Sequence, residues 1–147
     1  CASGLLEPGH VLIVVRSGIL RHTIPVAVNA VPVALNQDIR AFLLDDQVLP
    51  EYLAWFIEGK QQPLIEQWCK AVTTVESVEM EYLRDSVVPV PPLKEQRSIA
   101  EGISKSSERL NRLGADITNS TNLLKERRAA LITAAVTGQI PIEEMSA

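Results

Sequence analysis

The chain has 147 residues, enough for one domain with a hydrophobic core, and 46% of them are hydrophobic, as in ordinary globular proteins. Its net charge of -4 argues against a general polyanion-binding protein, although specific loops can still form a local basic site. No run of about 18 apolar residues is present to span a membrane, and the two cysteines have no metal-ligand or disulfide spacing, so we expect a cytoplasmic protein.

The first part of the chain predicts short strands separated by polar turns. Val11–Val15 is a continuous apolar run, consistent with a strand that is buried on both faces. Pro25 and Pro32 interrupt the apolar stretch 24–35, which predicts two short strands or one irregular strand. A further strand is predicted over residues 39–44.

Helical periodicity follows these strands. Over residues 50–69 apolar side chains share one helical face, and Gly59 and Pro63 are expected to divide the stretch into two helices. After them we expect a loop, one or two helical turns and a last short strand, over residues 70–77, 78–85 and 87–90. Because strands come first and helices later, the sequence predicts an α+β fold with a small antiparallel or mixed sheet.

The last third predicts one long, coiled-coil-forming helix over residues 93–138. Isoleucine or leucine recurs every seven residues, and a second, weaker seam is interrupted by Ser106, Ser120 and Arg127. This a/d heptad pattern continues for about five heptads, as in a helix that supercoils with a partner. Pro91 and Pro92 suit the approach to such a helix, and Gly138 suits a left-handed cap at its end. The positions expected at the pairing interface are Ile99, Ile103, Leu110, Leu113, Ile117, Leu124 and Leu131.

We therefore expect three segments: a globular part over residues 1–92, the long helix over 93–138 and a tail over 139–147. At about 1.5 Å per residue the helix would be about 65 Å long, too long for the modest globular part to cover. Pairing with another chain is predicted, and packing on its own domain stays open as the alternative. Since the chain begins with Cys1 rather than Met, we expect further sequence before it.

Motifs of common catalytic sites are not found. The sequence has no phosphate-binding glycine loop, no H-E-x-x-H and no G-x-S-x-G. Its two histidines are too few and too poorly placed for a metal cluster, and the adjacent acids Asp45 and Asp46 are typical of a solvated turn. The sequence predicts a binding or assembly module without catalytic or metal-binding residues.

The residues at the start of the long helix carry a family resemblance. V-P-V-P-P-L-K-E-Q-R-S-I-A over 88–100 resembles the stretch that closes a target-recognition domain and opens the spacer helix in the specificity (S) subunit of type I restriction–modification systems. Residues 124–138 resemble the end of that helix. Looser similarities are R-S-G at 16–18, N-Q at 36–37 and Y-L at 52–53.

Two features depart from the family pattern. The family commonly has a glycine before the Ser/Thr residues of a loop that precedes the last short strand, and here Lys70-Ala71-Val72-Thr73-Thr74 lacks it. A full subunit has two recognition domains and two helices, whereas this chain has one helix. The resemblance thus implies a half-subunit, or a piece of one whose recognition domain lacks its N-terminal portion.

The resemblance implies a non-catalytic role in DNA recognition. The globular part would recognise one half of a split target in double-stranded DNA, and the helix would set the distance to the other half and dock methyltransferase (M) subunits. A restriction (R) subunit would hydrolyse ATP and cleave DNA. S-adenosylmethionine, ATP and Mg are expected in the partner subunits and no cofactor in this chain. With one helix per chain, two copies would pair as a homodimer.

Two loops are expected to contact DNA, because Arg and Lys pair with guanine edges or phosphates and Ser and Thr serve either. The candidates are Arg16, Ser17, Arg21, His22, Lys70, Thr73 and Thr74. The alternative for Arg16 is an ion pair with a nearby acid, and for His22 an ordinary surface position. Trp55 and Trp68 are expected in the core rather than as base-stacking platforms.

Three other functions stay open from the sequence. The chain could be a coiled-coil interaction or adaptor module with no role at DNA, which its acidic net charge favours. It could be an inactive, truncated specificity subunit. An enzyme that uses the region of Asp45 and Asp46 is supported by nothing beyond the acids themselves.

Overall fold

The computed structural model describes residues 5–70 and 76–139. The chain divides into two compact units, residues 1–103 and 104–147. The described part of the first unit contains the sheets, three short α-helices, one 3-10 helix and the first turns of the long helix. The second unit contains the rest of that helix.

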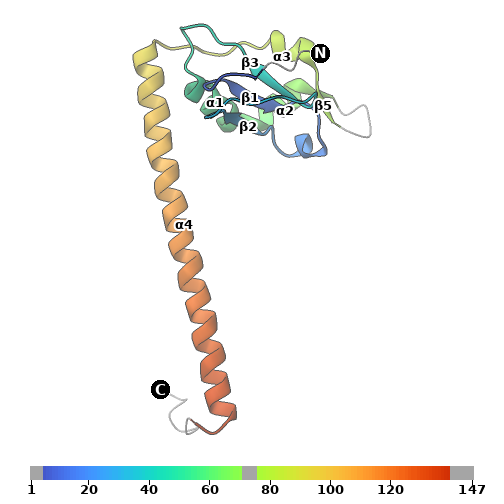
Figure 1. Ribbon diagram of the computed structural model, residues 1–147. Coiled ribbons are helices and arrows are strands. Elements are labelled where there is room, and N and C mark those ends of the chain that lie inside the picture. Colours follow the sequence, from blue (N-terminus) through green and yellow to red (C-terminus); the bar gives the residue numbers. More distant parts are fainter. Residues whose placement is uncertain (1–4, 71–75, 140–147) are drawn as a thin grey trace. The chain divides into compact units, whose positions relative to one another are not determined.

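A three-stranded antiparallel sheet forms the centre of the first unit (Figure 1). β1 (Val11–Val14) lies in the middle, with β2 (Val26–Val28) on one side and β3 (Ile39–Phe42) on the other. Val11 pairs with the last residue of both neighbouring strands. The predicted α+β class is confirmed, and of the two sheet types left open the described strands have the antiparallel one.

Burial along β1 alternates. Val11, Ile13 and Val15 are buried, whereas Leu12 and Val14 are half-buried. The buried set faces the hydrophobic core, so one face of the strand is fully covered and the other only in part. The expectation of full burial on both faces was therefore too strong, because a continuous apolar run does not reveal which face the helices cover.

One strand forms where one or two were predicted over residues 24–35. β2 is that strand, and beyond it Val33 forms a single antiparallel bridge with Leu6. Pro32 has no N–H to donate to a ladder, which limits the second pairing to this bridge. The buried Asn29 side chain accepts a bond from the His10 N–H at 2.7 Å, and its amide donates to two carbonyl oxygens.

Two helices, α1 (Pro50–Gly59) and α2 (Gln61–Trp68), supply the other side of the core. Their buried residues are those of the predicted apolar faces: Tyr52, Leu53, Ile57, Leu64, Ile65 and Trp68. The break between the helices lies at Lys60. Pro63 does not divide them, because it lies in the first turn of α2, where the missing N–H costs no intrahelical bond.

Two short strands enclose part of the predicted loop 70–77. β4 (Cys69–Lys70) pairs antiparallel with β5 (Ser77–Val78), and residues 71–75 between them lie outside the described residues. We call β4 and β5 the hairpin strands. α3 (Met80–Arg84) follows, so the expected helical segment is a short one.

The strand predicted over residues 87–90 was wrong. These residues have no ladder partner, and Val87 is 91% exposed. Pro89 and the prolines that follow lack the N–H groups that a strand would donate. Val88 packs against the core, and Tyr52 donates its hydroxyl to the Pro89 carbonyl oxygen at 2.8 Å. These two contacts attach the connector between α3 and α4 to the rest of the first unit.

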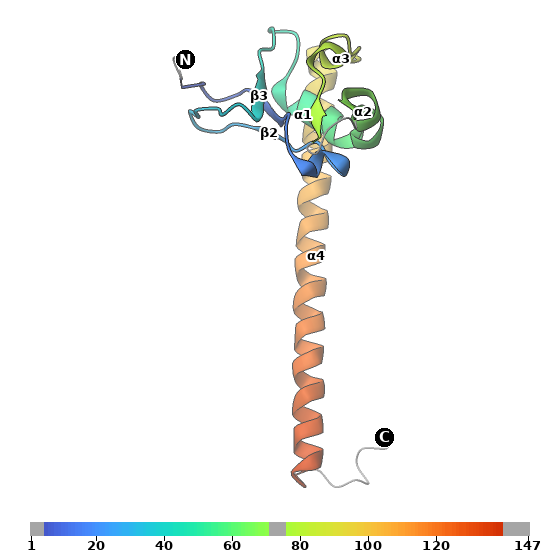
Figure 2. The same cartoon turned by 90° about the vertical axis from the view of Figure 1, so that its right-hand side faces the viewer.

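The long helix α4 (Leu93–Val136) has 44 residues, as the heptad pattern predicted to within two residues (Figure 2). Its end is a glycine cap. Gly138 has a positive φ of 73°, its N–H donates to Ala135, and the Gln139 N–H donates to Ala134. This pair of bonds is the Schellman motif, which satisfies carbonyl oxygens that the last turn would leave free.

The predicted pairing positions are all exposed on the single chain. The exposed fraction is 36–38% at Ile99 and Ile103 and rises to 65–67% at Leu110, Ile117 and Leu124. No helix in the described part of the chain is both long and apolar enough to cross a membrane.

Gln96 anchors the start of α4 within the first unit. Its side chain is fully buried, accepts a bond from the Leu49 N–H at 2.8 Å and donates to the carbonyl oxygens of Gln47 and Pro91, each at 2.7 Å. Leu49 is the N-cap of α1 and has no side-chain cap of its own. Gln96 thus supplies a hydrogen-bond acceptor at the N-terminus of α1, where no local side chain caps the helix.

Candidate nucleic-acid interface

The central strand continues past its last ladder residue toward the hairpin strands. Val15 donates its N–H to Asp38 at 2.8 Å and accepts a bond from the Val78 N–H at 2.9 Å. Arg16 then forms an antiparallel bridge with Ser77. The chain segment that carries the first predicted loop is therefore hydrogen-bonded to the segment that closes the second.

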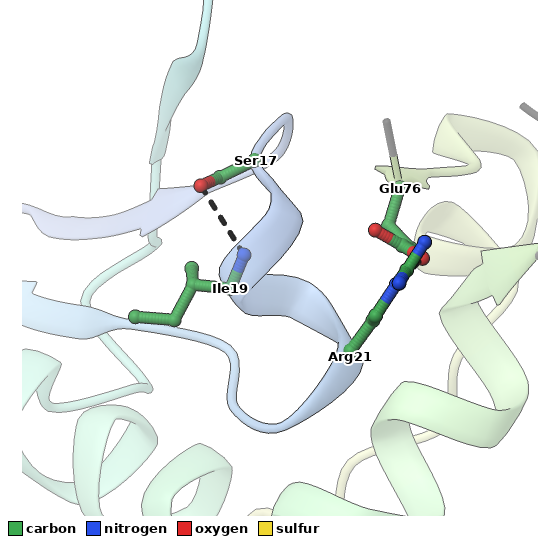
Figure 3. Close-up of polar contacts among 4 residues, drawn as sticks. All are labelled: Ser17, Ile19, Arg21 and Glu76. Atoms are coloured by element: carbon green, nitrogen blue, oxygen red, sulfur yellow. Dashed lines mark hydrogen bonds and ion pairs between the residues drawn. The ribbon is translucent and has the colours of Figure 1, made fainter. Parts of the chain in front are cut away.

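Ser17 turns the chain into a short 3-10 helix, η1 (Gly18–Arg21). Its hydroxyl oxygen accepts a bond from the Ile19 N–H at 3.4 Å (Figure 3), and its own N–H donates to the Glu76 carbonyl oxygen at 3.2 Å. Leu20, which is fully buried, anchors this turn in the core. We call residues 16–22 the cap loop.

An ion pair joins the end of η1 to the start of β5. Arg21 donates from Nε to Oε1 of Glu76, and Figure 3 shows the two side chains pointing toward one another. The Arg21 side chain is 61% exposed, whereas that of Glu76 is only 9% exposed. The acid is thus buried beneath the surface and the base lies above it.

The electrostatics at Glu76 follow from this contact. The hydrogen bond from Arg21 lowers the pKa of Glu76, and electrostatic interactions with Arg21 and His22 act in the same direction, against the effect of burial. Glu76 therefore stays a carboxylate at neutral pH. Its negative charge is balanced by the guanidinium of Arg21 in the cap loop.

The other candidates of the cap loop face solvent. Arg16 and His22 are exposed, and Ser17 is half-buried through its capping role. The ion pair that stood as the alternative for Arg16 is made instead by Arg21. Exposed basic side chains on a backbone that is fixed at both ends are suited to contact phosphates and base edges.

The second predicted loop is described only at its ends. Lys70 is the last residue of β4, and its backbone pairs with Ser77, the residue that also bridges to Arg16. Thr73 and Thr74 lie outside the described residues. The structure thus brings the backbone of Lys70 close to the cap loop.

Comparisons with known proteins decide the family. The model of the type I restriction modification DNA specificity domain matches residues 6–122, which is more than half of the chain. The chain belongs to this family. The match covers the sheets, the cap loop, the hairpin strands and more than half of α4.

Individual relatives agree with this family. The chain is 32% identical over 101 residues to the specificity subunit of the type I restriction enzyme EcoR124I/EcoR124II of Escherichia coli, covering 69% of this chain and 25% of the relative. It is 34% identical over 71 residues to the EcoBI specificity subunit of Escherichia coli, covering 48% of this chain and 15% of the relative. The chain therefore spans a quarter or less of these relatives.

A solved structure has the same fold. A chain from a structural study of complex assembly and conformational transition of the type I R-M system superposes with a TM-score of 0.75, at 20% identity, over 92% of this chain and 32% of that one. Of the residues that sequence reasoning suggested as DNA contacts, the described ones lie on the cap loop and, for Lys70, at the end of β4.

Sequence reasoning missed two residues of this region. Glu76 follows an apolar and threonine-rich stretch, and no periodicity marks it as the partner of a base 55 residues earlier. Gln61 begins α2, and its side chain accepts from the Ile24 N–H at 2.6 Å and donates to the carbonyl oxygen of the same residue at 3.0 Å. It fixes the chain where it leaves the cap loop.

In residues 5–70 and 76–139, no group of three or more His, Cys, Asp or Glu side chains is placed to hold an ion. What the described side chains offer is hydrogen-bond donation from Arg16, Arg21 and His22 on a fixed backbone. That chemistry suits recognition of an anionic or acceptor-rich partner.

Proposed function

We propose that this specificity domain recognises one half of a split target in double-stranded DNA, using the cap loop together with the hairpin strands. The single observation that supports the proposal is the bridge between Arg16 and Ser77, which joins the cap loop to the end of the second candidate loop in a DNA specificity domain. Arginine and lysine side chains there would supply both phosphate contacts and guanine contacts.

The same proposal assigns α4 to assembly. Its exposed apolar row would pair with the helix of a second copy, giving a homodimer, and would dock methyltransferase subunits. Membership of the specificity-domain family supports a non-catalytic role for this chain. S-adenosylmethionine, ATP and Mg would then be bound by methyltransferase and restriction subunits, and this chain would contribute specificity to their complex.

Arg16→Ala and Lys70→Ala test the recognition surface. Each should weaken DNA binding by the complex with its methyltransferase subunit by about 5- to 100-fold, because each removes a donor to a phosphate or a base edge. Binding is measured by fluorescence anisotropy at several salt concentrations. A lost phosphate contact should also reduce the slope of log affinity against log salt by about 1.

Arg40→Ala is the matched control. It removes an exposed arginine from β3, away from the cap loop in sequence, and should leave affinity unchanged. Melting temperatures of the three variants should equal that of the unaltered chain. If Arg16→Ala and Lys70→Ala bind DNA as tightly as Arg40→Ala, the proposed recognition surface is wrong.

A further inference from the structure

Glu76 is attached to the cap loop twice. Its carbonyl oxygen accepts a bond from the Ser17 N–H at 3.2 Å, and its side-chain Oε1 accepts one from Nε of Arg21. The remaining carboxylate oxygen, Oε2, is buried and has no hydrogen-bond partner among the described residues. Glu76 therefore contacts both the start and the end of η1.

Arg21 keeps part of its hydrogen-bonding capacity for another molecule. A guanidinium has five N–H donors in a planar fork, and the bond to Glu76 uses the one on Nε. Nη1 and Nη2, which carry the other four, form no hydrogen bond within the described part of the chain, and the side chain is 61% exposed. Two parallel donors at a fixed position match the O6 and N7 acceptors of guanine.

We propose that Glu76 is a positioning residue for sequence readout: it holds Arg21 by Nε and so directs Nη1 and Nη2 to a guanine in the major groove of the half-site. This inference rests on the proposed function. It specifies guanine as the base that is recognised, and it assigns a role in recognition to Glu76, which itself touches no DNA. The cap-loop backbone bond at Ser17 fixes the same geometry from the other end of η1.

A purely structural role for the ion pair is a poor explanation. One partner is mostly in water, and ion pairs with an exposed partner contribute little to stability, because solvent screens them and ordering the side chains costs entropy. Fixing an otherwise flexible arginine does matter for readout, because the entropy of ordering that side chain is lost before DNA binds rather than during binding.

The experiment measures base discrimination, one base pair at a time. The complete specificity subunit, in complex with its methyltransferase subunit, selects sites from a random DNA pool, and the relative affinity for each base is obtained by sequencing. Arg21→Ala should lose about 5- to 100-fold discrimination for guanine at one base pair. Glu76→Gln should lose much of the same preference at the same pair while binding to unrelated DNA changes little.

Double and conservative variants make the result specific. Because the two residues act as a unit, Arg21→Ala with Glu76→Gln should discriminate no worse than Arg21→Ala alone. Arg21→Lys keeps a positive charge beside Glu76 but has no planar fork, so it should lose the guanine preference as well. Arg40→Ala should show the unaltered preference at every position.

The outcomes separate this inference from the proposed function. If Arg21→Ala loses a guanine preference and a folded Glu76→Gln keeps it, the positioning role is overturned and the recognition surface stands. If Glu76→Gln does not fold, Arg21→Lys decides, and an unaltered guanine preference in it overturns the inference. If Arg16→Ala, Lys70→Ala and Arg21→Ala all leave binding and preference unchanged, the proposed function fails as well.

Discussion

Single polar side chains hold together parts of this domain that are far apart in sequence. Gln96, Gln61 and Asn29 each satisfy two or three backbone groups, and none of these groups has a regular ladder partner at that point. Buried backbone groups need partners, and an amide side chain offers both donors and an acceptor. These residues therefore supply the backbone hydrogen-bond partners that a longer sheet would otherwise provide.

Gln96→Ala should destabilise the chain by about 2–4 kcal/mol, because it removes three bonds and leaves buried backbone groups without partners. Gln96→Glu keeps the shape but replaces the two donated bonds with repulsion between oxygens, so it should be at least as harmful. Urea unfolding monitored by circular dichroism gives the free energies. Ser98→Ala, an exposed change on the same helix, should stay within about 0.5 kcal/mol.

Glu76 gives the domain a small pH-dependent contribution to stability. The bond from Arg21 lowers the pKa of the folded carboxyl below 4.5, so near that pH the folded state binds fewer protons than the unfolded state. The contribution is complete above the unfolded-state pKa and is lost as the pH falls through the lower folded-state pKa.

The free energy of unfolding should therefore fall more steeply below about pH 4.5 in the unaltered chain than in Glu76→Gln. Urea titrations at a series of acidic pH values measure both slopes. Asp46→Asn, which neutralises an exposed acid, serves as the comparison and should keep the steep slope. Equal slopes in the unaltered chain and in Glu76→Gln would contradict this assignment.

At the level of elements, hydrophobic periodicity predicted the positions of the helices. The long helix formed over the residues that the heptad repeat predicted. The buried residues of α1 and α2 lie on the expected apolar faces, because a helix that buries one face must repeat apolar residues at that spacing. Contacts across long sequence separations were not predictable. A strand forms only where a neighbouring strand is available for pairing, and no local sequence pattern indicates this. The pairing of β4 with β5 and the lack of a strand over residues 87–90 both depend on it.

The candidate site shows the same division. Basic residues in a turn marked the cap loop, and the threonine-rich stretch marked the second loop. That the end of the second loop adjoins the cap loop follows from the bridge of Arg16 to Ser77, two residues that are 61 positions apart in the sequence. Glu76 could not be singled out, because an acid becomes a partner of Arg21 only once both strands are placed.

Ile117→Asp tests α4 as a pairing element. Ile117 is at the middle of the apolar row and is 66% exposed on the single chain. Burying a charge in a helix–helix seam is costly, so self-association should weaken by about 100-fold or more. Asn119→Asp introduces the same charge off the seam and should associate like the unaltered chain.

Analytical ultracentrifugation over a concentration series measures both variants. A dimer in the unaltered chain and in Asn119→Asp, with a monomer in Ile117→Asp, is the expected pattern. A monomer in all three chains at tens of micromolar would contradict homodimerisation through α4, and would leave docking of a partner subunit as the use of this row.

At the scale of the whole molecule, the chain spans a quarter or less of its curated relatives and has one long helix. A homodimer would place two identical recognition surfaces in one complex, and a twofold protein favours a palindromic target. Site selection by the complex should therefore yield two identical, inverted half-sites. Two unrelated half-sites would contradict a symmetric dimer and would indicate a second, different recognition domain.

The continuation of β1 into the cap loop has a thermodynamic consequence for binding. The backbone from Val15 to Ser17 is already hydrogen-bonded on both sides, and Leu20 is already packed, before any ligand arrives. Little conformational freedom is then left for DNA binding to remove at these residues. The cap loop would therefore recognise its target as a preorganised loop rather than by folding on binding. Calorimetry should then show only a small heat-capacity change from ordering of the protein.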